Sequence, residues 1–194
     1  MQSIPHPETP TNCNAHEKRA MPAERFVDQL NEQIANEFAA HQQYVACAVY
    51  YDALTMPQMA GFFYAQAMEE RSHAMMMVKY LVDQDAPVHT PGVAAPVVTF
   101  ENLVAPVELA LEQERRVTAQ INELTRIARE ESDFASDQFM QWFIKEQVEE
   151  VATMSDLVAV VRRSQNNIEA IEDYIQREQS GEGLDPTAPA IAGG

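Results

Sequence analysis

The residues best suited to chemistry in this chain are a glutamate and a histidine three positions apart, Glu70 and His73. If their segment is helical, the Glu-x-x-His spacing places a carboxylate and an imidazole on one helix face. Three other segments with helical periodicity carry candidate partners, namely Glu37, Glu114, and Gln147 with Glu150. A glutamate on each of two helices and a Glu-x-x-His on each of the other two is the pattern of carboxylate-bridged di-metal sites in four-helix bundles.

The charges of these side chains favour two metal ions over one. Burying an unpaired carboxylate is expensive, and four neighbouring carboxylates would repel one another until some took up protons. No lysine or arginine lies at an obviously inward helical position to neutralise them. The four glutamates together carry −4 when ionised, which two divalent cations would balance.

The donor set also indicates which metal would bind and how firmly. Carboxylates with one imidazole and no thiolate favour Fe²⁺ or Mn²⁺ over structural zinc. The set is asymmetric, because Gln147-x-x-Glu150 stands where a symmetric site would repeat Glu-x-x-His. We therefore expect one metal to be held firmly with His73 and the other more weakly, by oxygen ligands alone. A weak second position suits iron that passes through the site.

Four long segments with apolar residues at helical spacing must position these side chains, and they are predicted at about residues 22–51, 55–84, 106–130 and 134–163. Thr55 is the expected N-cap of the second helix. A shorter helix is expected at residues 168–179, capped by Asn166 or Asn167. Both chain ends are polar and rich in Pro or Gly. We therefore expect a flexible arm at residues 1–21, a helical domain at 22–180 and a disordered tail at 181–194.

The connection between the second and third helices is long, and geometry explains its length. Residues 85–105 hold three prolines and show no helical period. An extended segment of about 20 residues can span roughly 65 Å, whereas a helix of about 28 residues is about 42 Å long. The loop can therefore run the full length of the helices. The sequence predicts an all-α fold, a four-helix bundle with one long crossover and a short fifth helix.

Composition excludes several classes of partner. The chain has 194 residues and a formal net charge of −17, which argues against nucleic acid because phosphate binding requires clustered lysine and arginine. No apolar run approaches the ~18–20 residues of a membrane span, and the N-terminal residues lack the apolar core of a signal peptide. A cytoplasmic protein with no membrane partner is therefore expected. The two cysteines, Cys13 and Cys47, form no metal-binding motif.

Four segments resemble the bundle helices of the bacterial non-haem ferritins: NEFAAHQQY, AMEERSHAMMMVKYL, LEQERRVTAQINEL and FMQWFIKEQVEEV. The likeness runs in order over about residues 24–180. It implies a ferritin-like four-helix bundle that assembles into a homo-oligomeric cage of twenty-four subunits. It also implies a ferroxidase that oxidises Fe²⁺ to Fe³⁺ with O₂ or H₂O₂ and an iron store that keeps the product as a mineral.

Carried over by position, the resemblance implies a role for each candidate residue. The ligands of the first iron would be Glu37, Glu70 and His73, and those of the second would be Glu114 and Glu150, with Glu70 as the bridge and Gln147 alongside. Glu69, Glu146 and Glu149 match the glutamates of a third, nearby iron site. The matching aromatic residues beside the di-iron centre, which could supply electrons during oxygen reduction, are Tyr44 and Trp142.

Haem is not expected. The related bacterioferritins place a haem-binding methionine directly after the glutamate of the Glu-x-x-His motif, whereas Arg71 stands there in this chain.

Several alternatives stay open at the level of sequence. The same centre could serve a non-storage di-iron or di-manganese oxidoreductase or peroxidase. The chain could also be a metal-free helical scaffold or a DNA-protecting shell, although the lack of a basic arm argues against DNA binding. His41 is an additional ligand, a hydrogen-bonding partner of a metal-bound carboxylate or, as is more common for such a residue, a hydrogen-bonded packing histidine. The third-site glutamates could be only exposed charge on helix surfaces.

Overall fold

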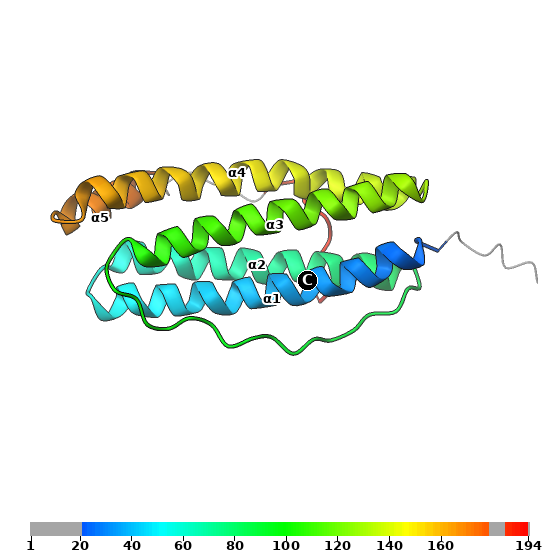
Figure 1. Ribbon diagram of the computed structural model, residues 1–194, viewed down its shortest axis with the longest axis horizontal. Helices are drawn as coiled ribbons and strands as arrows, with labels where there is room; N and C mark the ends of the chain where they lie inside the picture. The colour runs from blue at the N-terminus through cyan, green and yellow to red at the C-terminus, as the bar shows by residue number, and fades with distance from the viewer. Residues whose placement is uncertain (1–20, 179–184, 194) are drawn as a thin grey trace, which may run out of the picture.

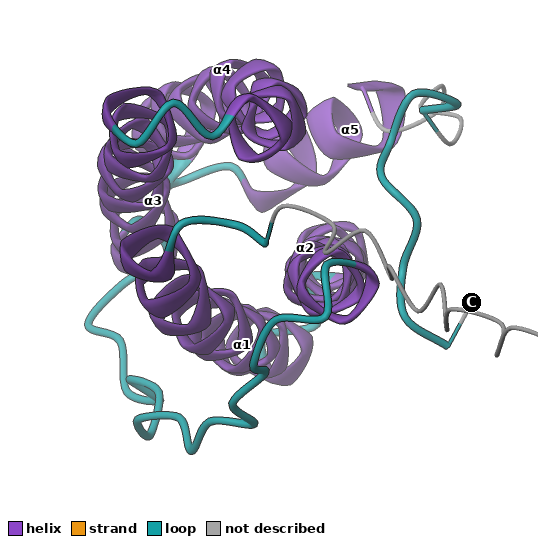
Figure 2. Ribbon diagram, turned by 90° about the vertical axis from the view of Figure 1, so that its right-hand side faces the viewer, coloured by secondary structure: helices purple, strands orange, loops and turns teal. Residues whose placement is uncertain are grey.

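The computed structural model describes residues 21–178 and 185–193. These residues form helices and no strands: α1 (Glu24–Ala53), α2 (Pro57–Asp83), α3 (Ala105–Glu130), α4 (Phe134–Ser164) and α5 (Ile168–Glu178). Helices α1 to α4 lie along one another as a bundle, and α5 packs against α2 and α4 at one end (Figures 1 and 2). The predicted fold class is confirmed, and the helix limits agree with the predicted ones to within two residues.

The long crossover between α2 and α3 runs beside α1 along the length of the bundle (Figure 1). Two amide side chains of α1 hold it there. Gln43 donates from Nε2 to the Val97 carbonyl (2.9 Å) and accepts from the Val97 N–H at Oε1 (2.8 Å). Asn31 likewise donates to the Pro87 carbonyl (3.0 Å) and accepts from the His89 N–H (2.7 Å). These contacts satisfy backbone groups that have no helix or strand partner of their own.

Side chains just before α4 and α5 cap these helices. Asp133 accepts from the Ser136 N–H at 3.1 Å, and Asn167 accepts from the Ala170 N–H at 3.1 Å. Of the two asparagines predicted to cap the fifth helix, Asn167 is therefore the one that does so.

The start of α2 differs from the prediction. Thr55 is not the N-cap, because its φ is 60°, in the left-handed region, and Met56 occupies the N-cap position without a side-chain cap. The cap comes from α5 instead. The carboxylate of Glu172 accepts from the backbone N–H groups of Gln58 (2.8 Å) and Met59 (3.0 Å). A carboxylate at a helix N-terminus also interacts favourably with the helix dipole.

We expect Glu172→Ala to lower the free energy of unfolding by about 1–2 kcal/mol, the usual effect of losing a charged cap. The substitution leaves two N–H groups of α2 without a protein acceptor and weakens the attachment of α5. Hydrogen exchange at Gln58 and Met59 should become faster, and the thermal midpoint should fall. Glu169→Ala, which removes an exposed glutamate from the same short helix, is the matched control. Unchanged amide protection in Glu172→Ala would contradict the role of the cap.

The core of the bundle consists of two apolar clusters with a polar layer between them. One cluster, near α5, includes Tyr51, Phe63 and Leu157, and the other, at the opposite end, includes Leu30 and Leu124. Each of the four bundle helices, α1 to α4, contributes residues to both clusters and carries buried polar residues between its two contributions. Those polar residues are Glu37, Glu70, His73, Glu114, Gln147 and Glu150. The apolar clusters thus exclude water from both ends of the polar layer.

Part of the C-terminal tail also differs from the expectation. Residues 185–193 were expected to be disordered, yet Asp185 accepts a hydrogen bond from the Trp142 indole (3.1 Å) and the Ala192 N–H donates to the Met75 carbonyl (3.2 Å). Ala188 and Ile191 pack against the apolar cluster at the end away from α5. The expected arm at residues 1–21 lies outside the described residues except for Met21, and so do residues 179–184 and 194. The domain limits 22–180 therefore stay a prediction.

No helix in the described part of the chain is long and apolar enough to cross a membrane.

Candidate metal centre

The centre of the polar layer brings together a carboxylate from α1 with the Glu-x-x-His pair of α2. Glu37, Glu70 and His73 each offer one ligand atom, and these atoms all lie within 4.8 Å of one another. The three residues are 1%, 3% and 4% exposed. Nδ1 of His73 lies 3.5 Å from Oε2 of Glu70. The spacing predicted from the sequence therefore does place both α2 side chains on the inward face.

The hydrogen bonds of these carboxylates leave two oxygen atoms unused. Oε1 of Glu37 accepts from Gln33 Nε2 at 2.8 Å, but Oε2 of Glu37 and Oε2 of Glu70 have no hydrogen-bond partner among the described residues. A buried oxygen without a partner is unfavourable by roughly 1–3 kcal/mol, and more when it is charged. A cation held between the two oxygens and the imidazole would remove that penalty.

Across the bundle, α3 and α4 present a second group of polar side chains joined by hydrogen bonds. The hydroxyl of Tyr44 donates a short hydrogen bond to Oε1 of Glu114. Gln147 approaches the other oxygen of Glu114, with Nε2 at 3.5 Å from Oε2. Thr118 then donates to Oε1 of Gln147 at 2.9 Å. The carboxylate of Glu150, 6% exposed, completes the group.

Burial dominates the electrostatics of the centre. It raises the pKa of Glu70 and of Glu150 well above the usual range, and the charge of Glu114 raises both further. The pKa of Glu114 is itself raised to about 7, chiefly by burial, although hydrogen bonds from Tyr44 and Gln147 oppose the rise. Burial lowers the pKa of His73, which keeps its imidazole neutral and able to bind a metal. The metal-free centre therefore holds protons that cations would displace.

The predicted third-site glutamates line a groove outside the centre. Glu69, Glu146 and Glu149 border a groove of about 420 Å³ between α2, α4 and α5, and Glu150 lines it as well. Gln66 also lines this groove and donates to Glu69. Because Glu150 is almost fully buried, the groove connects the polar layer with the surface of the bundle.

His41 lies outside the group of ligand atoms within 4.8 Å of one another. Its Nδ1 is 2.6 Å from the Ala67 carbonyl oxygen, to which a ring N–H at that position donates. This contact ties α1 to α2 and favours the packing role over the ligand role.

Two aromatic rings hold the imidazole of His73. Trp142 lies edge-on to it, with ring centroids 5.6 Å apart at 70°, and Phe143 does so at 5.9 Å and 79°. The sequence indicated Trp142 only through the family resemblance, and it did not indicate Phe143.

Sequence reasoning missed several residues that support the centre: Gln33, Gln66, Phe143, Thr118 and Asp185. Four of them carried a usable signal, because each lies four positions from a predicted site residue, the spacing of neighbours on one helix face: Gln33 from Glu37, Gln66 from Glu70, Thr118 from Glu114 and Phe143 from Gln147. Asp185 belongs to a separate segment, and its contact had no such signal.

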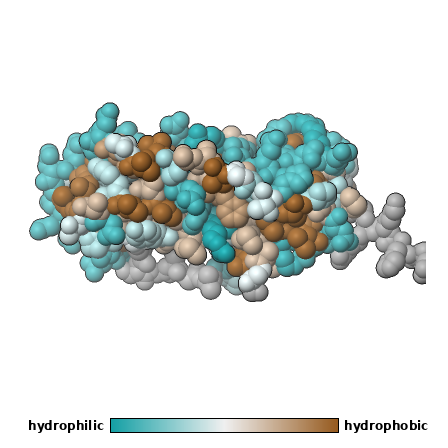
Figure 3. Space-filling model, turned by 90° about the horizontal axis from the view of Figure 1, so that it is seen from below, coloured by the Kyte–Doolittle hydropathy of each residue, from teal (hydrophilic) through white to brown (hydrophobic). Residues whose placement is uncertain are grey.

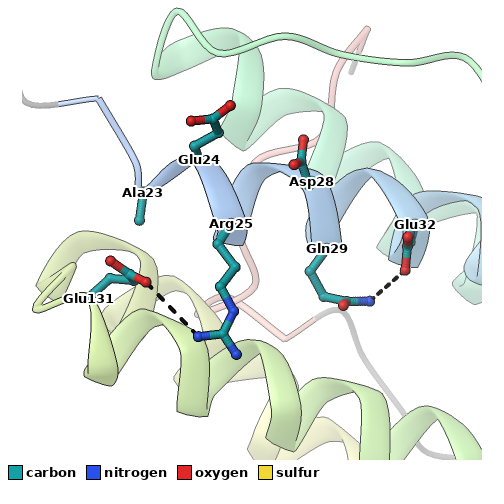
Figure 4. Close-up of a pocket in the computed structure, with 7 residues that line it drawn as sticks. All are labelled: Ala23, Glu24, Arg25, Asp28, Gln29, Glu32 and Glu131. Atoms are coloured by element: carbon teal, nitrogen blue, oxygen red, sulfur yellow. Dashed lines mark hydrogen bonds and ion pairs between the residues drawn. The ribbon is translucent and has the colours of Figure 1, made fainter.

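A larger hollow, of about 540 Å³, lies elsewhere, at the start of α1 beside the end of α3 (Figure 4). Its carboxylates are exposed, and Arg25 lies among them, 4.0 Å from Glu131. Gln29 donates to Glu32 at 2.9 Å. Exposed carboxylates are solvated and need no metal, so this hollow does not compete with the buried centre.

Comparison with known proteins agrees with this geometry. The sequence profile of the ferritin-like domain matches residues 27–164. The chain is 51% identical over 170 residues to a protein named ferritin BfrB from Mycolicibacterium smegmatis, a match that covers 88% of this chain and 94% of the relative. It is 32% identical over 161 residues to a bacterial non-heme ferritin from Staphylococcus aureus, covering 83% and 96%.

Solved structures show the same relationship. A humanised archaeal ferritin superimposes with a TM-score of 0.78 at 29% identity, covering 83% of this chain and 99% of that one. An open-pore ferritin from Archaeoglobus fulgidus does so with a TM-score of 0.77 at 30% identity, covering 82% and 99%. The resemblance seen in the sequence is confirmed, and the chain belongs to the ferritin family.

Proposed function

We propose that this protein is a ferroxidase and iron store, which oxidises Fe²⁺ to Fe³⁺ with O₂ or H₂O₂ at the buried centre and keeps the product as a mineral inside a cage. One observation carries the proposal. Two buried carboxylate oxygens, Oε2 of Glu37 and Oε2 of Glu70, have no partner among the described residues, and the same two side chains together with His73 offer ligand atoms that all lie within 4.8 Å of one another. Membership of the ferritin family makes iron the cation to consider first.

Each helix of the bundle then contributes to the binding of two Fe²⁺ ions. The ligands of the first would be Glu37, Glu70 and His73, and those of the second would be Glu70, Glu114 and Glu150. Burial raises the pKa of Glu70 most, and the charges of Glu114 and Glu37 raise it further. Its carboxylate is therefore close to the carboxylates on both sides of the centre, which supports its role as the bridge. Gln147 would contribute a neutral and weaker ligand to the second ion, since an amide oxygen carries no full charge.

The electrons and protons of the reaction balance without any other cofactor. Each Fe²⁺ gives one electron to O₂, which takes up two protons and leaves as H₂O₂. With H₂O₂ as the oxidant, the same two electrons and two protons yield two water molecules. If Tyr44 and Trp142 each gave one further electron, O₂ would take four electrons and four protons in all and leave as two water molecules, and the hydroxyl proton of Tyr44 would pass to Glu114 along the hydrogen bond between them. Trp142, beside His73, is a second possible electron donor.

The groove outside the centre offers a route for the product. Glu69, Glu146 and Glu149 would form the third iron site, next to the weaker of the two oxidation positions. Fe³⁺ that leaves the second position through Glu150 would meet these carboxylates before it reaches the surface of the bundle. Hard oxygen ligands of this kind suit iron during transfer.

The storage part of the proposal requires many copies of the chain. We propose a homo-oligomer of twenty-four subunits in the cytoplasm, by analogy with the family. Apolar patches on the face that carries the crossover support an interface between copies (Figure 3). Val49 and Val98 are 54% and 68% exposed there, and both line a groove between α1 and the crossover. Apolar patches of this kind are commonly covered in an assembly.

One experiment separates the proposed function from its nearest alternative. The metal-free protein is sized by chromatography with light scattering, and aerobic Fe²⁺ is then added while ferric absorbance is followed. We expect a large hollow assembly that oxidises and retains many iron atoms per subunit. A small oligomer that stops at two iron atoms per chain would instead indicate a non-storage di-iron or di-manganese oxidoreductase. A protein that oxidises no iron at all would overturn both.

The Gln147→Glu variant tests whether the neutral side chain of Gln147 keeps iron binding at the second position weak so that the product can leave. A fourth carboxylate there, beside those of Glu70, Glu114 and Glu150, should tighten binding of the second iron about tenfold and slow multiple turnovers, because the product leaves less readily. The first turnover should be spared. Stopped-flow absorbance over one and then many equivalents of Fe²⁺ separates the two phases. Faster release of Fe³⁺ in this variant would contradict the proposed route.

A further inference from the structure

Residues 185–193, which we call the C-terminal strap, cross from α4 to α2 beside the metal centre. At α4 the strap is attached through Asp185, whose Oδ2 accepts from the indole Nε1 of Trp142 (3.1 Å) and from Nζ of Lys145 (3.2 Å). At α2 it is attached through the N–H of Ala192, which donates to the Met75 carbonyl at 3.2 Å. Figure 2 shows the strap passing alongside α2.

The carboxylate of Asp185 is well suited to hold a fixed position. Its second oxygen, Oδ1, accepts from the N–H (2.8 Å) and from the hydroxyl (2.7 Å) of Thr187. These contacts with Thr187, followed by the bond from Trp142, hold the pKa of Asp185 well below its usual range. Both oxygens are thus engaged, and the bond to the indole is between a charged acceptor and a neutral donor, which is stronger than a neutral pair.

Trp142 conveys this constraint towards the metal centre. Its ring lies edge-on to the imidazole of His73 at 5.6 Å and edge-on to Phe143 at 5.0 Å. Phe143 in turn packs on the same imidazole. The indole is only partly buried, so packing alone does not fix the outer edge that carries its N–H. The hydrogen bond to Asp185 fixes that edge.

The orientation of His73 matters because its imidazole offers one of the three clustered ligand atoms, and its Nδ1 lies 3.5 Å from Oε2 of Glu70. Residues outside the direct ligands that orient a metal-binding histidine commonly change metal affinity or activity by about 10–100-fold. We propose that Asp185 is a positioning residue for His73, acting through Trp142, so that the C-terminal strap tightens the first metal position. This inference rests on the proposed function of that centre.

The test is the affinity of the first position for Co²⁺, a divalent probe, in the full-length protein. Asp185→Ala should weaken binding about three- to tenfold, less than the loss of a direct partner of the ligand would. The half-saturating Fe²⁺ concentration for oxidation should rise by a similar factor, while the rate at saturation stays close to that of the wild type. Asp185→Asn, which keeps an acceptor for the indole, should restore most of the affinity.

The tryptophan fluorescence of the protein reports directly on this contact, because Trp142 is its single tryptophan. In Asp185→Ala the emission should move to longer wavelength and be quenched more readily by acrylamide. Asp173→Ala, which removes an exposed aspartate of α5, controls for the loss of one negative charge and should change neither readout. In a Trp142→Phe background, Asp185→Ala should no longer alter Co²⁺ affinity, since both substitutions remove the same hydrogen bond between Trp142 and Asp185.

Each other outcome counts against the inference. If the fluorescence of Asp185→Ala changes while Co²⁺ affinity does not, the strap is only structural, and the positioning role is overturned. It is overturned equally if neither readout changes, or if the effects of Trp142→Phe and Asp185→Ala are additive. His73→Ala tests the underlying centre separately. If that variant binds Co²⁺ as tightly as the wild type, the proposed metal centre itself is wrong, whatever the strap does.

Discussion

Glu70→Ala should lower the initial rate of Fe²⁺ oxidation by about 100-fold or more, because loss of a residue that merely supports a ligand already reduces activity by about 10–100-fold. Glu70 is the residue whose carboxylate is influenced by the charges on both sides of the centre, those of Glu37 and Glu114. Its removal should therefore affect both metal positions at once, and separate the two ions that must give their electrons together. Stopped-flow ferric absorbance after addition of two equivalents of Fe²⁺ per chain measures the effect.

The substitution should not unfold the bundle. It removes a buried carboxylate whose Oε2 has no partner, and helices tolerate alanine well. Helical content by circular dichroism and the size of the assembly should therefore match the wild type. Glu112→Ala, which removes an exposed carboxylate of α3, is the control for one lost charge and should oxidise iron normally. If Glu70→Ala oxidised iron as fast as Glu112→Ala, the assignment of the centre would be wrong.

The metal-free protein should become less stable as the pH rises from 5.5 to 7.5, by about 2 kcal/mol from Glu114 alone. The pKa of that carboxyl is raised from 4.5 to about 7 in the folded state, mainly by burial. Between those two values the folded protein holds a proton that the unfolded chain has lost. The free energy of unfolding therefore falls as the pH passes through this window. Glu70 and Glu150, whose pKa values are also raised, act in the same direction.

The buried imidazole works the other way. Burial lowers the pKa of His73, so the unfolded chain binds the extra proton and stability rises with pH near the ordinary histidine pKa. A substitution at Glu114 separates the contribution of the carboxyl to the pH dependence of stability from the contribution of His73. Glu114→Gln keeps the shape of the side chain but cannot titrate, and it should flatten the dependence of the thermal midpoint on pH. Glu112→Gln on the exposed side of α3 should leave the dependence unchanged.

Divalent metal should reverse the loss of stability at pH 7.5. Cations displace the protons and balance the carboxylates, and a ligand at 100 times its dissociation constant stabilises the folded state by about 2.7 kcal/mol. Scanning calorimetry at a fixed protein concentration, with and without Co²⁺ at each pH, measures both effects. Equal pH dependence in the wild type and Glu114→Gln would show that this carboxyl does not hold a proton in the folded protein.

Much of the centre was predictable because helical periodicity is a local property. The Glu-x-x-His spacing of Glu70 and His73 and the single inward glutamates follow from which positions share a helix face. The structure does bring Glu37, Glu70 and His73 together and joins Glu114 to Gln147 and Tyr44 across the bundle. Their roles as iron ligands stay predictions. The long crossover was also predictable, because only an extended chain of that length joins the far ends of two long helices.

The predictions that failed concern contacts between residues far apart in the chain. Thr55 is of a residue type that often caps helices, but the start of α2 is capped by Glu172, more than a hundred positions away. The polar, Gly-rich end of the chain indicated disorder. Residues 185–193 nevertheless supply the acceptor for the Trp142 indole and make apolar contacts with the bundle. Residue types predict the structure that a segment adopts by itself, whereas both of these segments make contacts with distant parts of the folded protein.

The sequence by itself determined the helices, the face that each one buries and the residue types that meet in the middle of the bundle, since these depend on spacing along a single helix. Only the tertiary structure decided which buried oxygens are left without partners, which side chain caps α2 and how Asp185 reaches the ring beside His73. Such contacts depend on the distance and orientation between elements. Those are set by the packing of the whole core, and local periodicity does not record them.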